Sequence, residues 1–233
     1  MTKKITLVTL LILISSCVLI FYLTENRSFC PSENELVKNK KIIPIQYSVP
    51  IEEALSFYPE LNDIHIKFEV IENGIPFVSR PTIFSTLFRS AKNRRYLILI
   101  AKKSIPLFDS ALMHTMPRNA QVGVIGHELA HTSDFINRNT LRMLRVAVGN
   151  LSSEYLDEFE QQTDIRTIDH GLGCNLLAWS SWIRTHINLD SSPKIKSIME
   201  DLDKTERYLK PTSIVRIMKE KGYTQCEDSM YYQ

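Results

Sequence analysis

The segment His127-Glu128-Leu129-Ala130-His131 places two histidines four residues apart, within a stretch whose apolar residues recur at helical spacing. Residues four apart in an α-helix lie on one face, so both imidazoles can reach the same metal ion. A glutamate beside the first histidine can take a proton from water bound to that ion. The pattern therefore predicts a metal-binding helix between Pro117 and Phe135, with Glu128 as general base.

A catalytic zinc ion needs a third protein ligand and an open position for water. Residues from Ser153 to His170 predict a second helix, which begins with a serine cap and is followed by two glycines as stop signals. Glu160 and Asp164 are four apart and share a face of this helix, so Glu160 is expected to bind the metal and Asp164 to accept the free N–H of a ligand histidine. Three other side chains remain possible third ligands: Glu154, Glu158 and His170.

The pair of motifs, HExxH followed by a helix with Glu-x-x-x-Asp, resembles the gluzincin metallopeptidases, especially their prenyl-protease-type and minigluzincin branch. The resemblance covers about Tyr96 to Gly173. It implies a Zn2+ ion, with Glu128 as general base and Asp164 hydrogen-bonded to a ligand. The implied ligands of the ion are His127, His131 and Glu160.

The resemblance also implies roles for residues outside the two motifs. Gluzincins commonly stabilise the oxyanion of the tetrahedral intermediate with a downstream His, Tyr or Arg, and the candidates here are His170 and Tyr155. We assign this role to His170; the alternative is that His170 only caps the end of its helix. In such enzymes an edge strand near the active-site helix pairs with an extended substrate. Residues 96–101 predict either that strand or an interior one.

The N-terminal residues are of a different kind. An uncharged run extends from Ile5 to Leu23, and its 19 residues would span about 30 Å as a helix. Residues 1–23 are therefore predicted to be a single transmembrane helix, with Lys3 and Lys4 in the cytoplasm and the rest of the chain in the periplasm. The alternatives are a lipoprotein signal, because Ile14-Ser15-Ser16-Cys17 resembles a lipoprotein box, and an ordinary cleaved signal peptide.

The charge balance limits the classes of binding partner, and the cysteine count limits the number of disulfides. The chain has 28 basic and 26 acidic residues, and only Lys3 and Lys4 are charged before Glu25, so the remainder is neutral. Bulk charge therefore does not support nucleic-acid binding, which needs a basic surplus. Beyond the apolar run are Cys30, Cys174 and Cys226, which can form at most one disulfide; a Cys30–Cys226 bond would tie the two ends of the domain.

The remaining sequence predicts one domain. Residues 24–41 are polar and indicate a stalk or linker, and residues 42–233 are expected to form a zincin-like domain. Strand patterns at 42–49, 64–70 and 95–101 precede the helical ones. The fold class is therefore α+β, with a small N-terminal sheet followed by the active-site helix and C-terminal helices, in addition to one N-terminal transmembrane helix.

Together with the resemblance, these features predict a membrane-anchored zinc metallopeptidase that hydrolyses peptide bonds in a peptide or protein substrate. The alternative is a non-catalytic zinc-bound ectodomain that acts as a partner-binding or envelope scaffold. The presence of Glu128 favours the enzyme, because a structural zinc site needs no base. The oligomeric state is left open.

Overall fold

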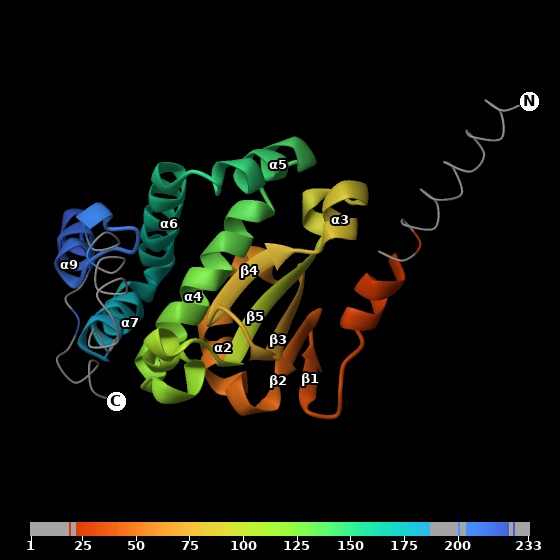
Figure 1. Ribbon diagram of the computed structural model, residues 1–233, viewed down its shortest axis with the longest axis horizontal. Coiled ribbons are helices and arrows are strands. Elements are labelled where there is room, and N and C mark those ends of the chain that lie inside the picture. The colour runs from red at the N-terminus through yellow and green to blue at the C-terminus, as the bar shows by residue number, and fades with distance from the viewer. Residues whose placement is uncertain (1–18, 20–21, 187–199, 201–203, 224–225, 227–233) are drawn as a thin grey trace, which may run out of the picture.

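The computed structural model describes residues 19, 22–186, 200, 204–223 and 226. The fold is α+β, with a five-stranded mixed sheet and helices that pack against it (Figure 1). The strands follow the spatial order β1-β2-β3-β5-β4. Their bounds are β1 Glu35–Lys38, β2 Lys41–Pro44, β3 His65–Asn73, β4 Phe77–Pro81 and β5 Arg95–Lys103.

The centre of the sheet is parallel and its margins are antiparallel. β3 pairs in parallel with β2 and β5, whereas β1 and β4 run antiparallel to β2 and β5. The strands predicted at 64–70 and 95–101 correspond to β3 and β5, but the one predicted at 42–49 ends at Pro44, where the chain turns into helix. Because β5 lies between β3 and β4, residues 96–101 form an interior strand, and the edge strands are β4 and β1.

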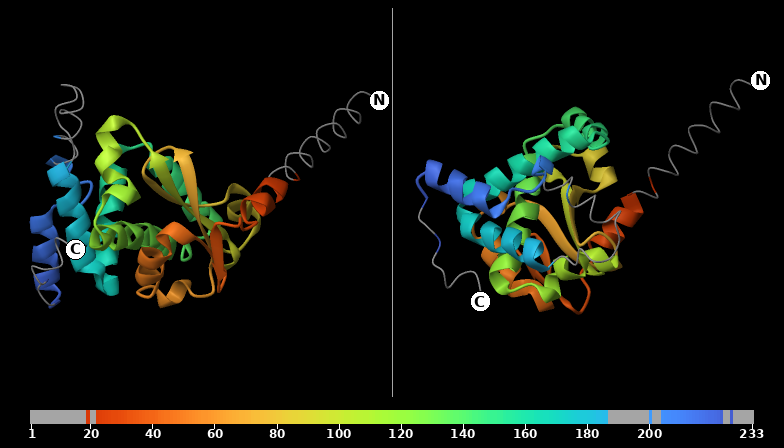
Figure 2. Two further views of the ribbon diagram at one scale, coloured as in Figure 1. Left: turned by 90° about the horizontal axis from the view of Figure 1, so that it is seen from below. Right: turned by 60° about the vertical axis from the view of Figure 1, so that its left-hand side comes forward.

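The principal helices come mostly after the sheet. Their bounds are α2 Ser48–Leu55, α3 Ile83–Phe88, α4 Arg118–Phe135, α5 Thr140–Gly149, α6 Ser153–Thr167, α7 Gly173–His186 and α9 Pro211–Glu220. α4 crosses the middle of the molecule, between the sheet and the layer of α6, α7 and α9 (Figures 1 and 2). Apolar side chains of β3, β5, α2 and α4 form one core, including Phe68, Ile98, Ile51 and Ile125.

The predicted transmembrane helix is the incorrect part of the fold assignment. In the described part of the chain, no helix combines the length and the apolar character needed to cross a bilayer. Of the predicted span, residues 5–18 and 20–21 lie outside the described residues, as does Cys17 of the lipoprotein alternative. This finding overturns the predicted single-pass topology and the periplasmic location deduced from it.

The segment 24–41 is part of the domain and not a free linker. It contributes β1, and the buried carboxylate of Glu25 accepts hydrogen bonds from the Thr82 hydroxyl, at 2.5 Å, and from the Ser85 backbone N–H, at 2.9 Å. Arg95 lies 3.7 Å from the same carboxylate. The segment is polar because its side chains pair with polar groups of the domain.

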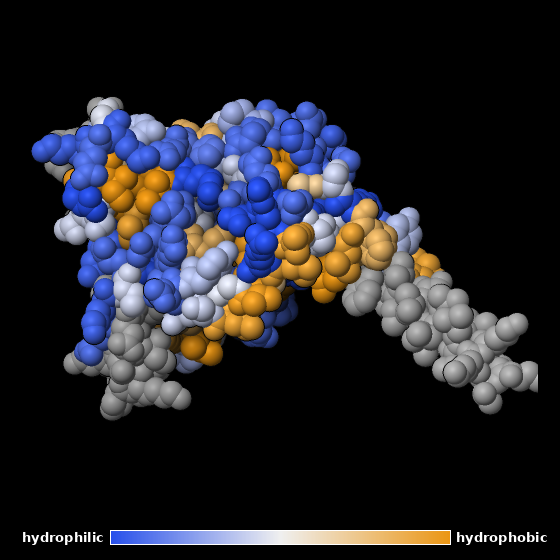
Figure 3. Space-filling model, turned by 90° about the horizontal axis from the view of Figure 1, so that it is seen from above, coloured by the Kyte–Doolittle hydropathy of each residue, from blue (hydrophilic) through white to orange (hydrophobic). Residues whose placement is uncertain are grey.

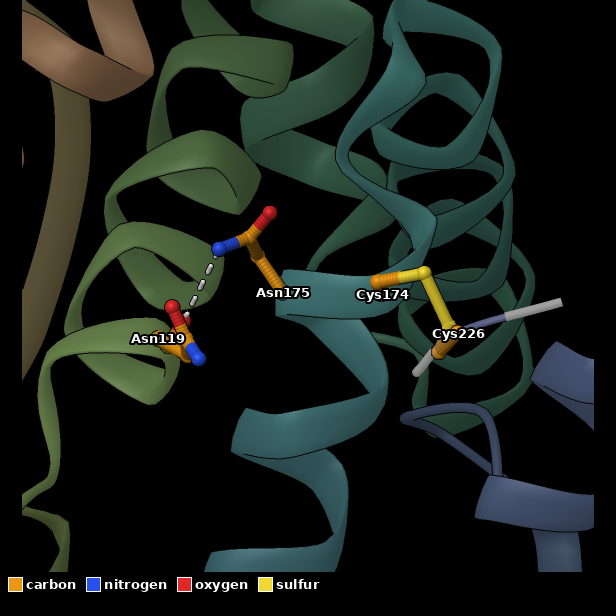
Figure 4. The surroundings of a disulfide bond; sticks show 4 residues. All are labelled: Asn119, Cys174, Asn175 and Cys226. Carbon is orange, nitrogen blue, oxygen red and sulfur yellow. Dashed lines mark hydrogen bonds between the residues drawn. A yellow bond between two sulfur atoms is a disulfide. The ribbon is translucent and has the colours of Figure 1, made fainter. Parts of the chain in front are cut away.

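The disulfide joins Cys174 to Cys226, so the predicted Cys30–Cys226 bond is wrong (Figure 4). α9 packs on α7, and Cys226, which lies beyond the end of α9, reaches Cys174 in the first turn of α7. Cys30 is a free, exposed thiol. The segment before β1, to which it belongs, lies on the opposite side of the molecule from α9 (Figure 1). The pairing was therefore decided by helix packing and not by closeness to the chain ends.

The start of α7 also lies directly against α4. A Cβ atom on Gly123 of α4 would come within 2.1 Å of the Asn175 carbonyl oxygen, so only glycine permits this approach. The Asn175 amide donates to the Asn119 carbonyl at 3.5 Å (Figure 4). α7 is thereby held between α4 and α9, close to the histidines of α4.

Candidate metal centre

Three side chains from α4 and α6 converge on one point. The Nε2 atom of His127 lies 3.1 Å from Nε2 of His131 and 3.0 Å from Oε2 of Glu160, and the third distance, from His131 to Glu160, is 3.3 Å. All three side chains are buried. Ligand atoms of a tetrahedral zinc ion, bonded at about 2.0–2.1 Å, lie about 3.3 Å apart. The donor atoms are therefore spaced to hold one ion of this kind.

Local sequence explains why each helix presents these groups. His127 and His131 are one turn apart on α4, and Glu160 and Asp164 are one turn apart on α6. α6 begins at the expected serine cap, where the Ser152 hydroxyl accepts from the Tyr155 backbone N–H at 3.5 Å. α6 then packs along α4 and brings the two pairs together.

Asp164 lies behind the first histidine, as the spacing predicted. The Nδ1–H of His127 donates to Oδ1 of Asp164 at 2.8 Å, which leaves Nε2 free to bind an ion. The Nδ1 atom of His131 lies 3.3 Å from the Thr163 hydroxyl. Both imidazoles are therefore oriented by neighbours on α6.

The charged groups of the cluster shift one another's pKa values. Burial raises the pKa of Glu160, but the nearby His131 and His127 outweigh burial and hold that pKa well below its usual range. Burial lowers the pKa of His127, but its contacts with Asp164 and Glu160 raise it well above the ordinary value. An anionic carboxylate beside two imidazoles is a donor set suited to a divalent cation.

Glu128 lies beside the ligands but outside the cluster. It is buried and faces the same cleft as His127. Burial raises its pKa, and the positive charge of the histidines offsets only part of that effect. A buried carboxyl group with a raised pKa is suited to exchange protons with a bound molecule.

A strap formed by residues 204–210 closes one side of the centre. The Leu209 backbone N–H donates to Oδ2 of Asp164 at 2.7 Å, while Oδ1 of the same carboxylate holds His127. The Ser180 hydroxyl of α7 donates to the Leu209 carbonyl at 2.7 Å. Asp164 therefore orients a ligand and the strap at the same time.

The strap contributes Tyr208, a residue that sequence reasoning missed. Its ring centroid lies 5.7 Å from that of His127 and 5.7 Å from that of Trp179. Although 37% of the residue surface is exposed, burial of the phenol group raises its pKa well above normal, and the charges of Glu160, Glu128 and Asp164 act in the same direction. The hydroxyl is therefore a protonated donor near the centre. Its distance along the chain from both motifs left no local signal to identify it.

The structure does not bring His170 to this centre. Its Nε2 atom lies 2.9 Å from Oε1 of Glu60, its Nδ1 atom lies 2.8 Å from the Arg166 carbonyl, and its ring stacks on Tyr58. Glu60 also accepts from Ser133 of α4, at 2.6 Å. The other predicted alternatives lie apart from the cluster as well: Tyr155, Glu154 and Glu158.

A cleft of about 260 Å³ opens beside His127 and Glu128. Its walls are mainly apolar and come from the β3–β4 turn, the start of β4, residues 106–111, α4, α7 and the strap. Among the lining side chains are Ile75, Phe77, Phe108, Leu176, Trp179 and Ile183. The cleft is therefore a mainly apolar space adjacent to the candidate metal ligands.

The edge strand β4 runs along α4 next to the cleft. The Ser79 hydroxyl lies 3.0 Å from that of Thr132 on α4, and the Ser79 backbone N–H is near enough to Glu128 to lower its pKa. An edge strand can pair with an extended peptide through main-chain hydrogen bonds.

Comparison with protein-family models, curated proteins and solved structures finds no match to this chain.

Proposed function

We propose that this protein is a zinc-dependent metallopeptidase of the gluzincin type, which hydrolyses peptide bonds. The observation that carries the proposal is the convergence of His127, His131 and Glu160 at 3.0–3.3 Å, with Glu128 in the adjoining cleft. Two imidazoles and one carboxylate, with an open position toward a cleft, are the donor set of a catalytic zinc ion. A closed structural site would use four protein ligands.

Different residues of the chain would perform different steps of the hydrolysis. A bound Zn2+ ion would polarise the scissile carbonyl and lower the pKa of the attacking water. Glu128 takes a proton from that water and passes it to the leaving amine. Tyr208 donates its phenolic O–H to the oxyanion of the tetrahedral intermediate, in place of the His170 expected from sequence. β4 aligns the substrate backbone, and the apolar cleft receives one of its side chains.

Removal of the metal is expected to abolish hydrolysis reversibly. The purified chain should contain a single zinc ion, and a chelator should eliminate cleavage of a quenched-fluorescence peptide library until Zn2+ is returned. Zinc at a thousandfold excess over its Kd should stabilise the folded chain by about 4 kcal/mol. Elemental analysis, cleavage rates and thermal melts provide the three readouts.

Two variants on α6 provide a matched comparison. Glu160→Ala removes a proposed ligand and should lose the zinc, whereas Glu158→Ala changes an exposed position on the same helix and should retain it. Equal zinc content in both variants would contradict the ligand assignment. A chain that binds zinc but cleaves no peptide would instead be the non-catalytic scaffold, and the proposed activity would be wrong.

Asp164→Asn is expected to weaken zinc binding by about 10- to 100-fold, because the amide loses the negative charge and one of the two acceptors that hold His127 and Leu209. Competition with a chromogenic chelator measures the change. Asp169→Asn is the control, since the Asp169 carboxylate pairs with Lys221, away from the centre. An unchanged zinc affinity in Asp164→Asn would show that the carboxylate does not orient its histidine.

A further inference from the structure

Two short helices expose large apolar side chains to solvent. On α3 these are Ile83, Leu87 and Phe88, and on α5 they are Leu141, Leu144 and Val148; each is between 49% and 68% exposed. We call this surface the α3–α5 face. Surface apolar residues are ordinary when scattered, but a group on neighbouring elements indicates a binding surface.

The two helices are adjacent. The Thr140 hydroxyl at the start of α5 donates to the Thr86 carbonyl of α3 at 2.9 Å, and both helices lie together at the top of Figure 1. Figure 3 looks onto that side and shows hydrophobic surface extending across it from the base of the N-terminal segment. Tyr22, in the helical residues 22–28, contacts Phe84 of α3 with ring centroids 5.4 Å apart.

Helical spacing makes the exposed stripe of α5 a distinct feature. Met143 and Val146 face the core, while Leu141, Leu144 and Val148 follow at intervals of three and four on the exposed side. A helix that packs only against its own domain has a polar outer face. α5 has an apolar stripe on its outer side as well as on its core side. The outer stripe can therefore contact an apolar partner outside the domain.

The sequence stretches that contain α3 and α5 carry only basic charged residues. The sequence has no acidic residue between Glu72 and Asp109, a stretch that includes α3, and none between Asp134 and Glu154, which includes α5. The exposed basic residues of these two stretches are Arg80, Lys92, Lys102, Lys103, Arg142 and Arg145. Since residues 24–233 are neutral overall, this excess is local. Apolar side chains bordered by arginine and lysine match the boundary between acyl chains and anionic headgroups.

We propose that the α3–α5 face docks on an anionic lipid surface. Its apolar side chains enter the boundary of the acyl region, and Arg142 and Arg145 pair with lipid phosphates. A symmetric dimer through this face is disfavoured, because it would bring like charges together. The docking is a contact of the folded domain, needs no membrane-spanning helix and is independent of the proposed activity.

Tryptophan scanning of the full chain tests this surface. Phe88→Trp and Leu144→Trp place a reporter on α3 and α5, and Val215→Trp places one on the distant α9, at a position that is 46% exposed. Each is mixed with vesicles of brominated phosphatidylcholine, with or without phosphatidylglycerol, and the quenching of the parent chain (from Trp179 and Trp182) is subtracted. We expect added quenching for the α3 and α5 reporters, strongest with phosphatidylglycerol, and none for the α9 reporter.

Each other outcome would overturn the proposal. Absence of added quenching at either α3 or α5 would remove that helix from the docking face. Equal quenching at all three positions would indicate unspecific adsorption. Concentration-dependent spectral change without lipid, together with dimers in analytical ultracentrifugation, would show that a second copy of the chain covers the face. All three substitutions are at exposed positions, so circular dichroism should show an unchanged fold.

Discussion

Glu128→Gln is expected to lower kcat/KM for peptide hydrolysis by about 10²- to 10⁴-fold while the chain remains folded and zinc-loaded. Glutamine has nearly the same shape as glutamate but cannot accept a proton at neutral pH. Glu128 lies in the cleft beside His127 and is not one of the three converging donors, so its loss should spare metal binding. The reaction would then lack the group that takes a proton from the attacking water.

Peptide cleavage, zinc content and the melting temperature should be measured together. Glu158→Gln is the matched control, because it makes the same chemical change at an exposed position on α6. Normal cleavage by Glu128→Gln would refute the proposed base. Loss of zinc from this variant would instead show that Glu128 supports the metal site.

Tyr208→Phe is expected to reduce kcat by about 10²- to 10³-fold, which is the usual effect of removing one donor to an oxyanion. The phenyl ring can keep its packing against Trp179 and His127, so only the hydroxyl is lost. The effect should appear in kcat with little change in KM, because the oxyanion develops only as the reaction proceeds.

His170→Gln discriminates between the two candidate donors. His170 pairs with Glu60 and stacks on Tyr58, so its replacement should leave kcat nearly unchanged. If His170→Gln lost activity and Tyr208→Phe did not, the sequence-based assignment would be correct and the structural one wrong. A rise in KM alone for Tyr208→Phe would make Tyr208 a substrate contact instead of a donor to the oxyanion.

The motifs on α4 and α6 could be predicted because their information is local. Residues four apart share a helical face, so the pairs His127/His131 and Glu160/Asp164 follow from spacing once both segments are helical. The alternation in β3 and the apolar run of β5 likewise identified those strands. The order of elements was sufficient to predict an α+β fold.

Other features depended on contacts between distant segments. The edge position of β4 follows from strand order, which the separate strand patterns do not contain. The residues before β1 looked like a linker because the partners of Glu25 lie about sixty residues further along the chain. Cys226 pairs with Cys174 because α9 packs on α7.

By itself, the sequence determined which side chains the centre contains: two imidazoles, a carboxyl group beside them, and a carboxylate pair on a second helix. Only the tertiary structure decided that Glu160 converges with the histidines, and that Tyr208 lies beside them while His170 does not. The physical reason is that helical periodicity sets which residues share a face, whereas packing sets what each face meets. Asp164 illustrates both effects. One of its carboxylate oxygens accepts a hydrogen bond from His127, and the other accepts one from the strap that carries Tyr208.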